Sequence, residues 1–338
     1  MTAHNIFFFI DPQNGFGKKD LTKEQGGSLY VPGGEAIGQP VADLLSHLTN
    51  ATVVLSQDFH PADHISFASN HPGAQPFQDI YLGETIDGRY KAVAADVTAT
   101  DGDTTVTKIC AVETDANGYI LRIHEDKVLS AEDVEGTVKQ RLWLDHCVQG
   151  TESALFLDPI MEALPERLRA SLLKQDPRFP VLYGKDNHGN LFCALRKGTQ
   201  SDVDSYGIAK ENDRKSKTFA PTLFEDIADR LQATGVKEAN IFIGGLATNF
   251  CVEFSHNDIY EYLVPQLEKR GIKPQVYFLS DISAGIPTPD ATPGIWPDLT
   301  TSTQRMAKFG TQETTTDDFI RANLAGRDVK PAFVAPVT

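Results

Sequence analysis

The chain has few cysteines for its length and no long apolar run. Its four cysteines show no close pairing in sequence; they are Cys110, Cys147, Cys193 and Cys251. A small disulfide scaffold is dense in cysteine, so this class is excluded, and we expect the reducing cytoplasm. The apolar run at 6–10 is far too short to cross a membrane and lacks the basic start of a secretion signal.

Positive charge is also scarce. The 338 residues hold 31 Lys and Arg against 46 Asp and Glu, a formal net charge of −15. Nucleic acids and anionic membranes select basic surfaces, so we expect neither as a partner. A small neutral substrate remains compatible, and a homo-oligomer is left open. The length allows a large core with an added insertion or lobe.

Four apolar runs each end on a residue that can do chemistry. In parallel α/β sheets, sites form at the carboxyl ends of the strands, so these residues are expected to meet at one edge. The runs and their following residues are 5–10 with Asp11, 52–57 with Asp58 and His60, 191–196 with Lys197, and 241–243 with Cys251.

Helical segments alternate with these strands and indicate a layered α/β fold. Helices are predicted at 34–49, 222–232 and 300–309, the last being the final one, and a further strand at 275–279. Residues 79–140 break the rhythm with strand-like runs around the Asn117-Gly118 hairpin signal. We therefore predict a core of 1–78 and 141–338 with a small antiparallel β lobe inserted at 79–140. A second hairpin is predicted at 181–195, and a loop at 287–297.

Cys251 follows the apolar run at 241–243 and a glycine-containing turn, and it opens a helical segment. Backbone N–H groups at a helix start stabilise a thiolate, which is the nucleophilic form of cysteine. Free cysteines are also commonly buried and inert. From this segment alone, a nucleophile and a structural cysteine are equally good interpretations.

Asp58 and His60 are two residues apart, a spacing that puts both side chains on one side of an extended segment. With His146 as a third ligand they would form an Asp/His/His set that suits zinc, iron(II) or manganese. His64 is close enough to be a fourth ligand or to support a ligand. Taken alone, the D-x-H pattern also fits histidines of a surface loop. Cys147 is set aside because neighbouring side chains diverge.

At this point the sequence resembles the nicotinamidase/pyrazinamidase branch of the isochorismatase-like cysteine hydrolases. The matching pieces follow the family's order and span nearly the whole core. They are 11–16 (DPQNGF), 26–29 (GGSL), 58–61 (DFHP), 64–67 (HISF), Trp143 with 146–148 (HCV), 197–198 (KG) and 245–252 (GLATNFCV).

The resemblance implies a three-layer α/β/α fold around a mainly parallel sheet, with a cis peptide before Ala247. It also implies roles for individual residues. These are Cys251 as nucleophile, Asp11 as base, Lys197 as third member of the triad, Asp58, His60 and His146 as metal ligands, and Phe16 and Trp143 as walls of a pyridine pocket. The chain departs from the family at Leu144, where proline is usual, and in its long 79–140 lobe.

The function so implied is hydrolysis of nicotinamide to nicotinate and ammonia, a step of NAD salvage, through a thioester on Cys251. The backbone N–H groups of Ala247 and Cys251 would hold the oxyanion. One divalent ion is expected, zinc first, with iron or manganese as alternatives. A metal-independent isochorismatase or an amidohydrolase of N-carbamoyl or ureido compounds is the alternative. A non-catalytic protein whose lobe binds a partner would not need Asp11, Lys197 and Cys251 together.

Overall fold

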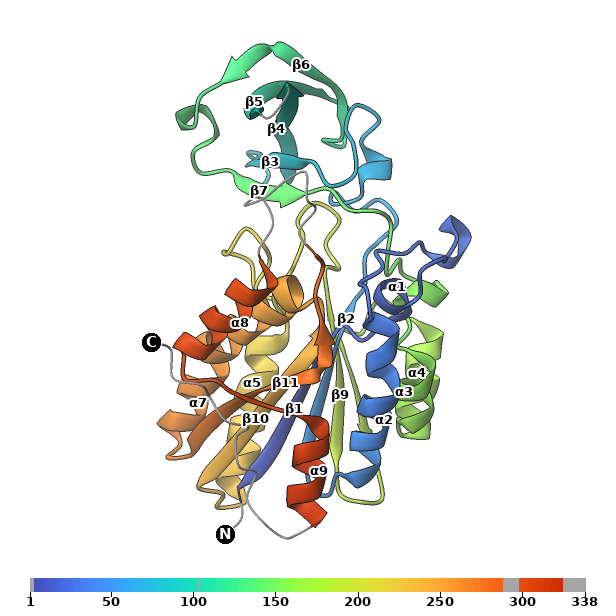
Figure 1. The fold of residues 1–338 in the computed structure, drawn as a ribbon, viewed down its shortest axis with the longest axis vertical. Coiled ribbons are helices and arrows are strands. Elements are labelled where there is room, and N and C mark those ends of the chain that lie inside the picture. The colour runs from blue at the N-terminus through green and yellow to red at the C-terminus, as the bar shows by residue number, and fades with distance from the viewer. Residues whose placement is uncertain (1–2, 102–103, 288–297, 325–338) are drawn as a thin grey trace.

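A seven-stranded sheet forms the centre of the larger part of the molecule (Figure 1). The computed structural model describes residues 3–101, 104–287 and 298–324. The strand order is β12-β11-β10-β1-β2-β9-β8, and every neighbouring pair is parallel except β8 with β9. The strands are β1 (His4–Ile10), β2 (Thr52–Asp58), β8 (Val181–Lys185), β9 (Leu191–Lys197), β10 (Glu238–Leu246), β11 (Lys273–Ala284) and β12 (Gln312–Thr314).

The four apolar runs predicted from the sequence are adjacent strands, in the order β10-β1-β2-β9. Residues 6–10 of β1 and all of β2 are buried, as expected for strands covered on both faces. Phe7 stacks on Phe242 of β10 with ring centroids 4.7 Å apart. Because the strands are parallel and in register, their carboxyl ends bring the following residues to one edge. The second hairpin is also confirmed, as β8 and β9.

Helices cover both faces of this sheet and give three layers (Figure 1). In the view of Figure 1, α2, α3 and α4 lie on one side and α5, α7 and α8 on the other. The helices are α1 (Asn14–Gly17), α2 (Gly38–His47), α3 (Asp158–Ala163), α4 (Glu166–Lys174), α5 (Ala220–Ala233), α6 (Glu253–Asp258), α7 (Val264–Lys269), α8 (Leu299–Lys308) and α9 (Thr316–Leu324).

The prediction that 300–309 is the final helix was wrong, because α9 follows it. Residues 316–324 hold few large apolar side chains, so their pattern in the sequence is weak. The helix is anchored by tertiary packing instead. Phe319 contacts Phe7 and Phe242 edge-on, with both centroid distances at 5.1 Å. A helix held by one aromatic anchor carries little of the periodicity on which sequence prediction relies.

A separate five-stranded antiparallel sheet lies beyond the carboxyl ends of the parallel strands (Figure 1). Its order is β6-β5-β4-β3-β7, and its strands are β3 (Asp79–Glu84), β4 (Tyr90–Asp101), β5 (Thr104–Thr114), β6 (Ile120–Leu129) and β7 (Val138–Arg141). The predicted hairpin joins β5 to β6, where Gly118 has a φ of 91°. A positive φ of this size is the reason for glycine at that turn.

This second sheet has its own apolar cluster, which extends into the loops around the first sheet. Ile80 and Leu82 of β3 are fully buried in one cluster with Ile65 and Val203. The backbone N–H of Tyr90 donates to Asp202 at 2.9 Å. The antiparallel sheet is thus packed onto the loops that follow β2 and β9.

Two further features bear on the predictions made from the sequence. The predicted loop at 287–297 lies, apart from Pro287, outside the described residues. In the described part of the chain, no helix has the length and apolar character needed to cross a membrane.

Candidate active site

Asp11, Lys197 and Cys251 meet at the carboxyl edge of the parallel sheet. The Lys197 Nζ lies 2.9 Å from Asp11 Oδ2 and 3.6 Å from Cys251 Sγ. Asp11 and Lys197 are almost fully buried, and Cys251 is 7% exposed. A carboxylate beside a thiol can accept its proton, and a nearby ammonium can stabilise the resulting thiolate, so this arrangement can activate a cysteine as a nucleophile.

The turn that carries Cys251 depends on close backbone packing after β10. Gly245 has a φ of 135°, and a Cβ there would lie 2.0 Å from the carbonyl oxygen of Ile10. Only glycine fits this position, so the ends of β1 and β10 can approach each other. The Leu246–Ala247 peptide is cis, as the family resemblance implied. The short helical turn η6 (Thr248–Val252) then presents Cys251 and continues into α6.

Burial sets the charge state of the triad. Burial raises the pKa of the Cys251 thiol well above its ordinary range, although Lys197 lowers it, so the resting side chain is a thiol. Burial also raises the pKa of Asp11 to about 6, against the lowering effect of Lys197. Asp11 is thus a carboxylate at neutral pH but a better proton acceptor than an exposed aspartate.

Ser56 of β2 orients Asp11. Its hydroxyl donates to Asp11 Oδ1 at 2.7 Å and accepts from the Asp11 backbone N–H at 3.0 Å. Both the carboxylate and the backbone of Asp11 are therefore fixed by the neighbouring strand. The remaining oxygen of Asp11 faces Lys197.

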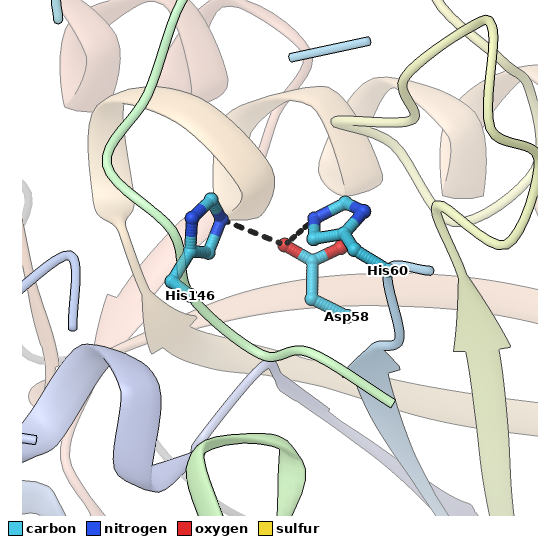
Figure 2. A group of neighbouring side chains, drawn as sticks. All are labelled: Asp58, His60 and His146. Atoms are coloured by element: carbon cyan, nitrogen blue, oxygen red, sulfur yellow. Dashed lines mark ion pairs between the residues drawn. The ribbon is translucent and has the colours of Figure 1, made fainter. Parts of the chain in front are cut away.

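Asp58, His60 and His146 form a second buried cluster (Figure 2). The Nε2 atoms of His60 and His146 lie 3.4 Å and 3.9 Å from Asp58 Oδ2. One ligand atom of each of the three residues lies within 4.8 Å of the others. The structure thus brings together the three residues that were predicted from the sequence to be metal ligands.

The hydrogen bonds of these histidines fit a cation site. His60 Nδ1 lies 2.9 Å from the Gly198 carbonyl oxygen, and His146 Nδ1 lies 2.7 Å from that of Leu144. A carbonyl only accepts, so each Nδ1 carries the proton, and a neutral ring then offers its Nε2 lone pair toward Asp58. Burial lowers the pKa of His146 to about 3, which keeps that ring neutral. This donor set suits a divalent ion such as zinc.

Burial lowers the pKa of His60, but the nearby carboxylates of Asp58 and Asp204 raise it, so that the pKa lies above its ordinary value. A proton and a cation would therefore compete for the same ring nitrogen of His60, so acid should weaken cation binding. Gly198 permits the contact that orients His60. Gly198 has a φ of 61°, and a Cβ at this position would lie 2.4 Å from Cε1 of the His60 imidazole, so a larger residue would clash with that ring.

A hydrogen bond between Lys197 and Asp58 joins the triad to the histidine cluster, a link that the sequence did not reveal. Lys197 Nζ donates to Asp58 Oδ1 at 2.6 Å, while Asp58 Oδ2 faces the two imidazoles. Lys197 and His60 lower the pKa of Asp58 even though burial raises it, so this carboxylate stays ionised. Gln13 holds the Asp58 backbone at both its N–H and its carbonyl, at 2.7 Å and 2.8 Å.

A cavity opens beside both clusters. Phe16 and Trp143, the predicted aromatic walls, both line it. Further lining residues that the sequence did not identify are Leu29, Asp204, Tyr206, Phe250 and Ile286. Trp143 packs edge-on against Phe250 with centroids 5.2 Å apart, so the apolar wall is rigid and largely aromatic.

The loop between β9 and α5 supplies Asp204 and Tyr206 to this cavity. Its Ser205 carbonyl accepts from Lys197 Nζ at 2.9 Å. Gln140 of β7 donates to Asp204 at 3.2 Å and to the Tyr206 hydroxyl at 3.4 Å. The antiparallel sheet therefore fixes one wall of the site. The only feature of the sequence that could have indicated a role for Asp204 is that it follows Lys197 closely in the chain.

The other predicted residues are placed as follows. His64 is fully buried, and its ring centroid lies 4.2 Å from that of His60. Cys147, set aside as a ligand, is buried with a φ of 50°. Ala247 lines the cavity together with Cys251. Leu144, at the position where the family has proline, is 42% exposed.

Known proteins with similar sequences and folds are nicotinamidases. The nicotinamidase of Acinetobacter baylyi is 28% identical over 249 residues, which cover 74% of this chain and 71% of that protein. The structure of an Acinetobacter baumannii nicotinamidase/pyrazinamidase aligns with a TM-score of 0.51 at 22% identity, over 94% of this chain and 99% of that one. The yeast nicotinamidase bound to the inhibitor nicotinaldehyde aligns with a TM-score of 0.51 at 18% identity, over 92% and 99%. No protein-family model matches the chain.

Proposed function

We propose that this chain, which is related in sequence and fold to the nicotinamidases of the isochorismatase-like superfamily, is an amidohydrolase that converts nicotinamide to nicotinate and ammonia. One observation carries the proposal. Lys197 joins Asp11 and Cys251 to Asp58, and through Asp58 to two imidazoles, beside one small aromatic cavity. A nicotinamide molecule in this cavity would have a nucleophile, a base and a cation site within its reach.

The first chemical step would begin from the thiol. Asp11 accepts the Cys251 proton while Lys197 stabilises the negative charge of the sulfur, which attacks the amide carbon. The backbone N–H groups of Ala247 and Cys251 would hold the oxygen of the tetrahedral intermediate, a contribution of about 3 kcal/mol for one such donor. Asp11 returns the proton to the amide nitrogen, and ammonia leaves a thioester on Cys251.

The second step would release the acid. Asp11 accepts a proton from water, the resulting hydroxide attacks the thioester carbon, and the C–S bond breaks. The Cys251 sulfur then regains a proton from Asp11, so all protons balance over the cycle. Phe16 and Trp143 would pack against the pyridine ring and hold the amide carbon near the sulfur.

Asp58, His60 and His146 would hold one divalent ion, zinc first, with iron or manganese as alternatives. When bound, the ion would supply a Lewis-acid anchor for the pyridine nitrogen. We propose that this reaction serves NAD salvage, and the absence of closely paired cysteines supports a cytoplasmic site of action.

The direct test is ammonia release from nicotinamide by the purified protein, measured together with nicotinate formation. Equal amounts of both products are expected. Loss of activity on treatment with a strong chelator, and its return with zinc or manganese, would separate this reaction from the metal-independent alternatives. A protein that releases no ammonia from nicotinamide in any metal-loaded state would contradict the proposal.

Replacing His146 by alanine should weaken cation binding with the least damage to the triad. We expect an affinity for the cation roughly 10- to 100-fold lower and a KM for nicotinamide raised by a similar factor. His146 is a cleaner choice than Asp58, because Asp58 also binds Lys197. His188→Ala, which changes an exposed histidine of the β8–β9 hairpin, is the matched control. Metal content equal to wild type in His146→Ala would reject this ligand.

We further propose that residues 79–140 form an inserted lobe whose inner strands serve the site and whose outer tip does not. Joining Ile80 to Arg141 with a short linker removes Gln140 and so the bonds to Asp204 and Tyr206. A folded, cation-binding protein with a KM raised about tenfold is expected. Replacing residues 97–108, the outer ends of β4 and β5, by a two-residue turn should leave KM unchanged. Equal KM values for the two deletion variants would contradict the proposal that the inner strands serve the site and the outer tip does not.

A further inference from the structure

A second cavity lies between the β9–α5 loop and helix α6, and the proposed reaction does not use it. Its volume is about 130 Å³, which is enough for a small ion with water. Phe254 and Asp258, four residues apart on one side of α6, line it together with Glu211 of the loop. Tyr206 lines both this cavity and the one beside Cys251, so the two cavities adjoin at that side chain.

Two buried acids line this second cavity, and each accepts a hydrogen bond from a neutral donor. Glu211 is 4% exposed, and its Oε1 accepts from Gln200 Nε2 at 3.3 Å. Asp258 is 6% exposed, and its Oδ2 accepts from the Ala209 backbone N–H at 2.7 Å. The other oxygen of Glu211, Oε2, has no hydrogen-bond partner among the described residues. A buried acid oxygen in this state indicates a ligand.

The basic residues that line the same cavity pair with acids elsewhere. Lys139 Nζ lies 3.1 Å from Asp79, and Lys210 Nζ lies 2.5 Å from Glu261. The third base, Arg214, is largely exposed and lies 4.0 Å from Glu261. The two buried acids have no ion pair of this kind in the part of the chain that the structure describes. The unpaired charge of the cavity is therefore negative, which favours a cationic ligand.

The size of that charge fits a monovalent ion. Burial raises the pKa of Glu211 to about 8, so this side chain is mostly protonated at neutral pH. Burial raises the pKa of Asp258 to about 6, so this one is mostly ionised. Together the two acids carry about one negative charge. The rings of Tyr206 and Phe254, with centroids 5.4 Å apart, add aromatic walls, which attract an ammonium group.

We propose that this second cavity binds one ammonium ion and that it receives the ammonia released at Cys251. The second part rests on the proposed function, which produces ammonia in the adjoining cavity. Ammonia is a stronger base than a carboxylate, so it takes the proton of Glu211 and becomes ammonium beside the carboxylates of Glu211 and Asp258. Glu211 regains a proton from solvent when the ammonium leaves. Ammonia held there cannot attack the thioester, so water reacts instead.

The experiment is thermal unfolding of the full chain in increasing ammonium chloride, without nicotinamide and with choline chloride keeping the ionic strength constant. Choline carries the same charge but has no N–H donor. Ammonium should raise the Tm of wild type until the site is saturated. Glu211→Gln and Asp258→Asn keep the side-chain size and an acceptor oxygen, and each should lower the apparent affinity for ammonium roughly tenfold. Glu268→Gln, which changes an exposed acid of α7, should respond as wild type does.

Two results would overturn the ammonium site. One is a wild-type Tm that rises no more with ammonium than with choline, and the other is an ammonium response equal to wild type in whichever of Glu211→Gln and Asp258→Asn folds. In turnover assays, Glu211→Gln should need roughly tenfold more added ammonium than wild type for the same inhibition. A protein that binds ammonium but does not hydrolyse nicotinamide would refute the proposed function and leave the site. Hydrolysis of nicotinamide without ammonium binding would refute the site alone.

Discussion

Replacing Cys251 by alanine is expected to abolish ammonia release from nicotinamide while the fold and the cation site persist. The sulfur would form the covalent bond to the substrate, and no other thiol lines the cavity among the described residues. A fall in kcat of roughly 10³-fold or more is expected. The loss of one buried atom should cost about 1 kcal/mol of unfolding free energy. Ammonia assays, zinc titration and thermal unfolding of the same preparation test all three statements.

Cys193→Ala is the matched control for this variant. Cys193 is also a fully buried free thiol, but it lies within β9 and does not line the cavity. It should retain wild-type turnover. An acyl adduct detected by intact-mass measurement on wild type and absent from Cys251→Ala would support the thioester. Comparable ammonia release from Cys251→Ala and wild type would eliminate Cys251 as the nucleophile.

The position of the candidate site at the carboxyl edge of the parallel sheet could be predicted from the sequence, because it depends on short apolar runs and the residues that follow them. Asp11, Asp58 and Lys197 each follow or end an apolar run, and parallel strands carry such ends to a common edge. The pairing of β1 with β10 and β2, and of β2 with β9, is what brings Cys251 to them. The need for glycine at 198 and 245 becomes clear only from the structure, because a Cβ at either position would clash with a neighbouring residue.

The rest of the site could not be read from the sequence because it depends on contacts between distant segments. Asp204 and Tyr206 lie in a loop, and Gln140, which fixes them, lies in the other sheet. No periodicity predicts that pairing. The charge states are equally non-local. A helix start lowers the pKa of a thiol, but the burial of Cys251 raises its pKa, and burial depends on the whole fold.

The thiol ground state makes the base decisive, so Asp11→Asn should have the second large effect. Asparagine keeps the size of the side chain and its contact with Ser56 but cannot accept the Cys251 proton. A fall in kcat of roughly 10²- to 10⁴-fold is expected. Lys197 keeps Asp58 as a partner, so the variant should fold and bind zinc. Steady-state kinetics and zinc titration provide the two measurements.

The pH profile provides a test of Asp11 that a purely structural role would not pass. Burial raises the pKa of Asp11 to about 6, and only its ionised form, present above that pH, can accept a proton. Wild-type kcat/KM should therefore fall as the pH drops through about 6, and the residual kcat/KM of Asp11→Asn should lack this acid limb. Asp20→Asn, which changes an exposed acid nearby in sequence, should keep both the rate and the limb. An Asp11→Asn enzyme with wild-type kcat/KM and an unchanged acid limb would show that another group takes the proton.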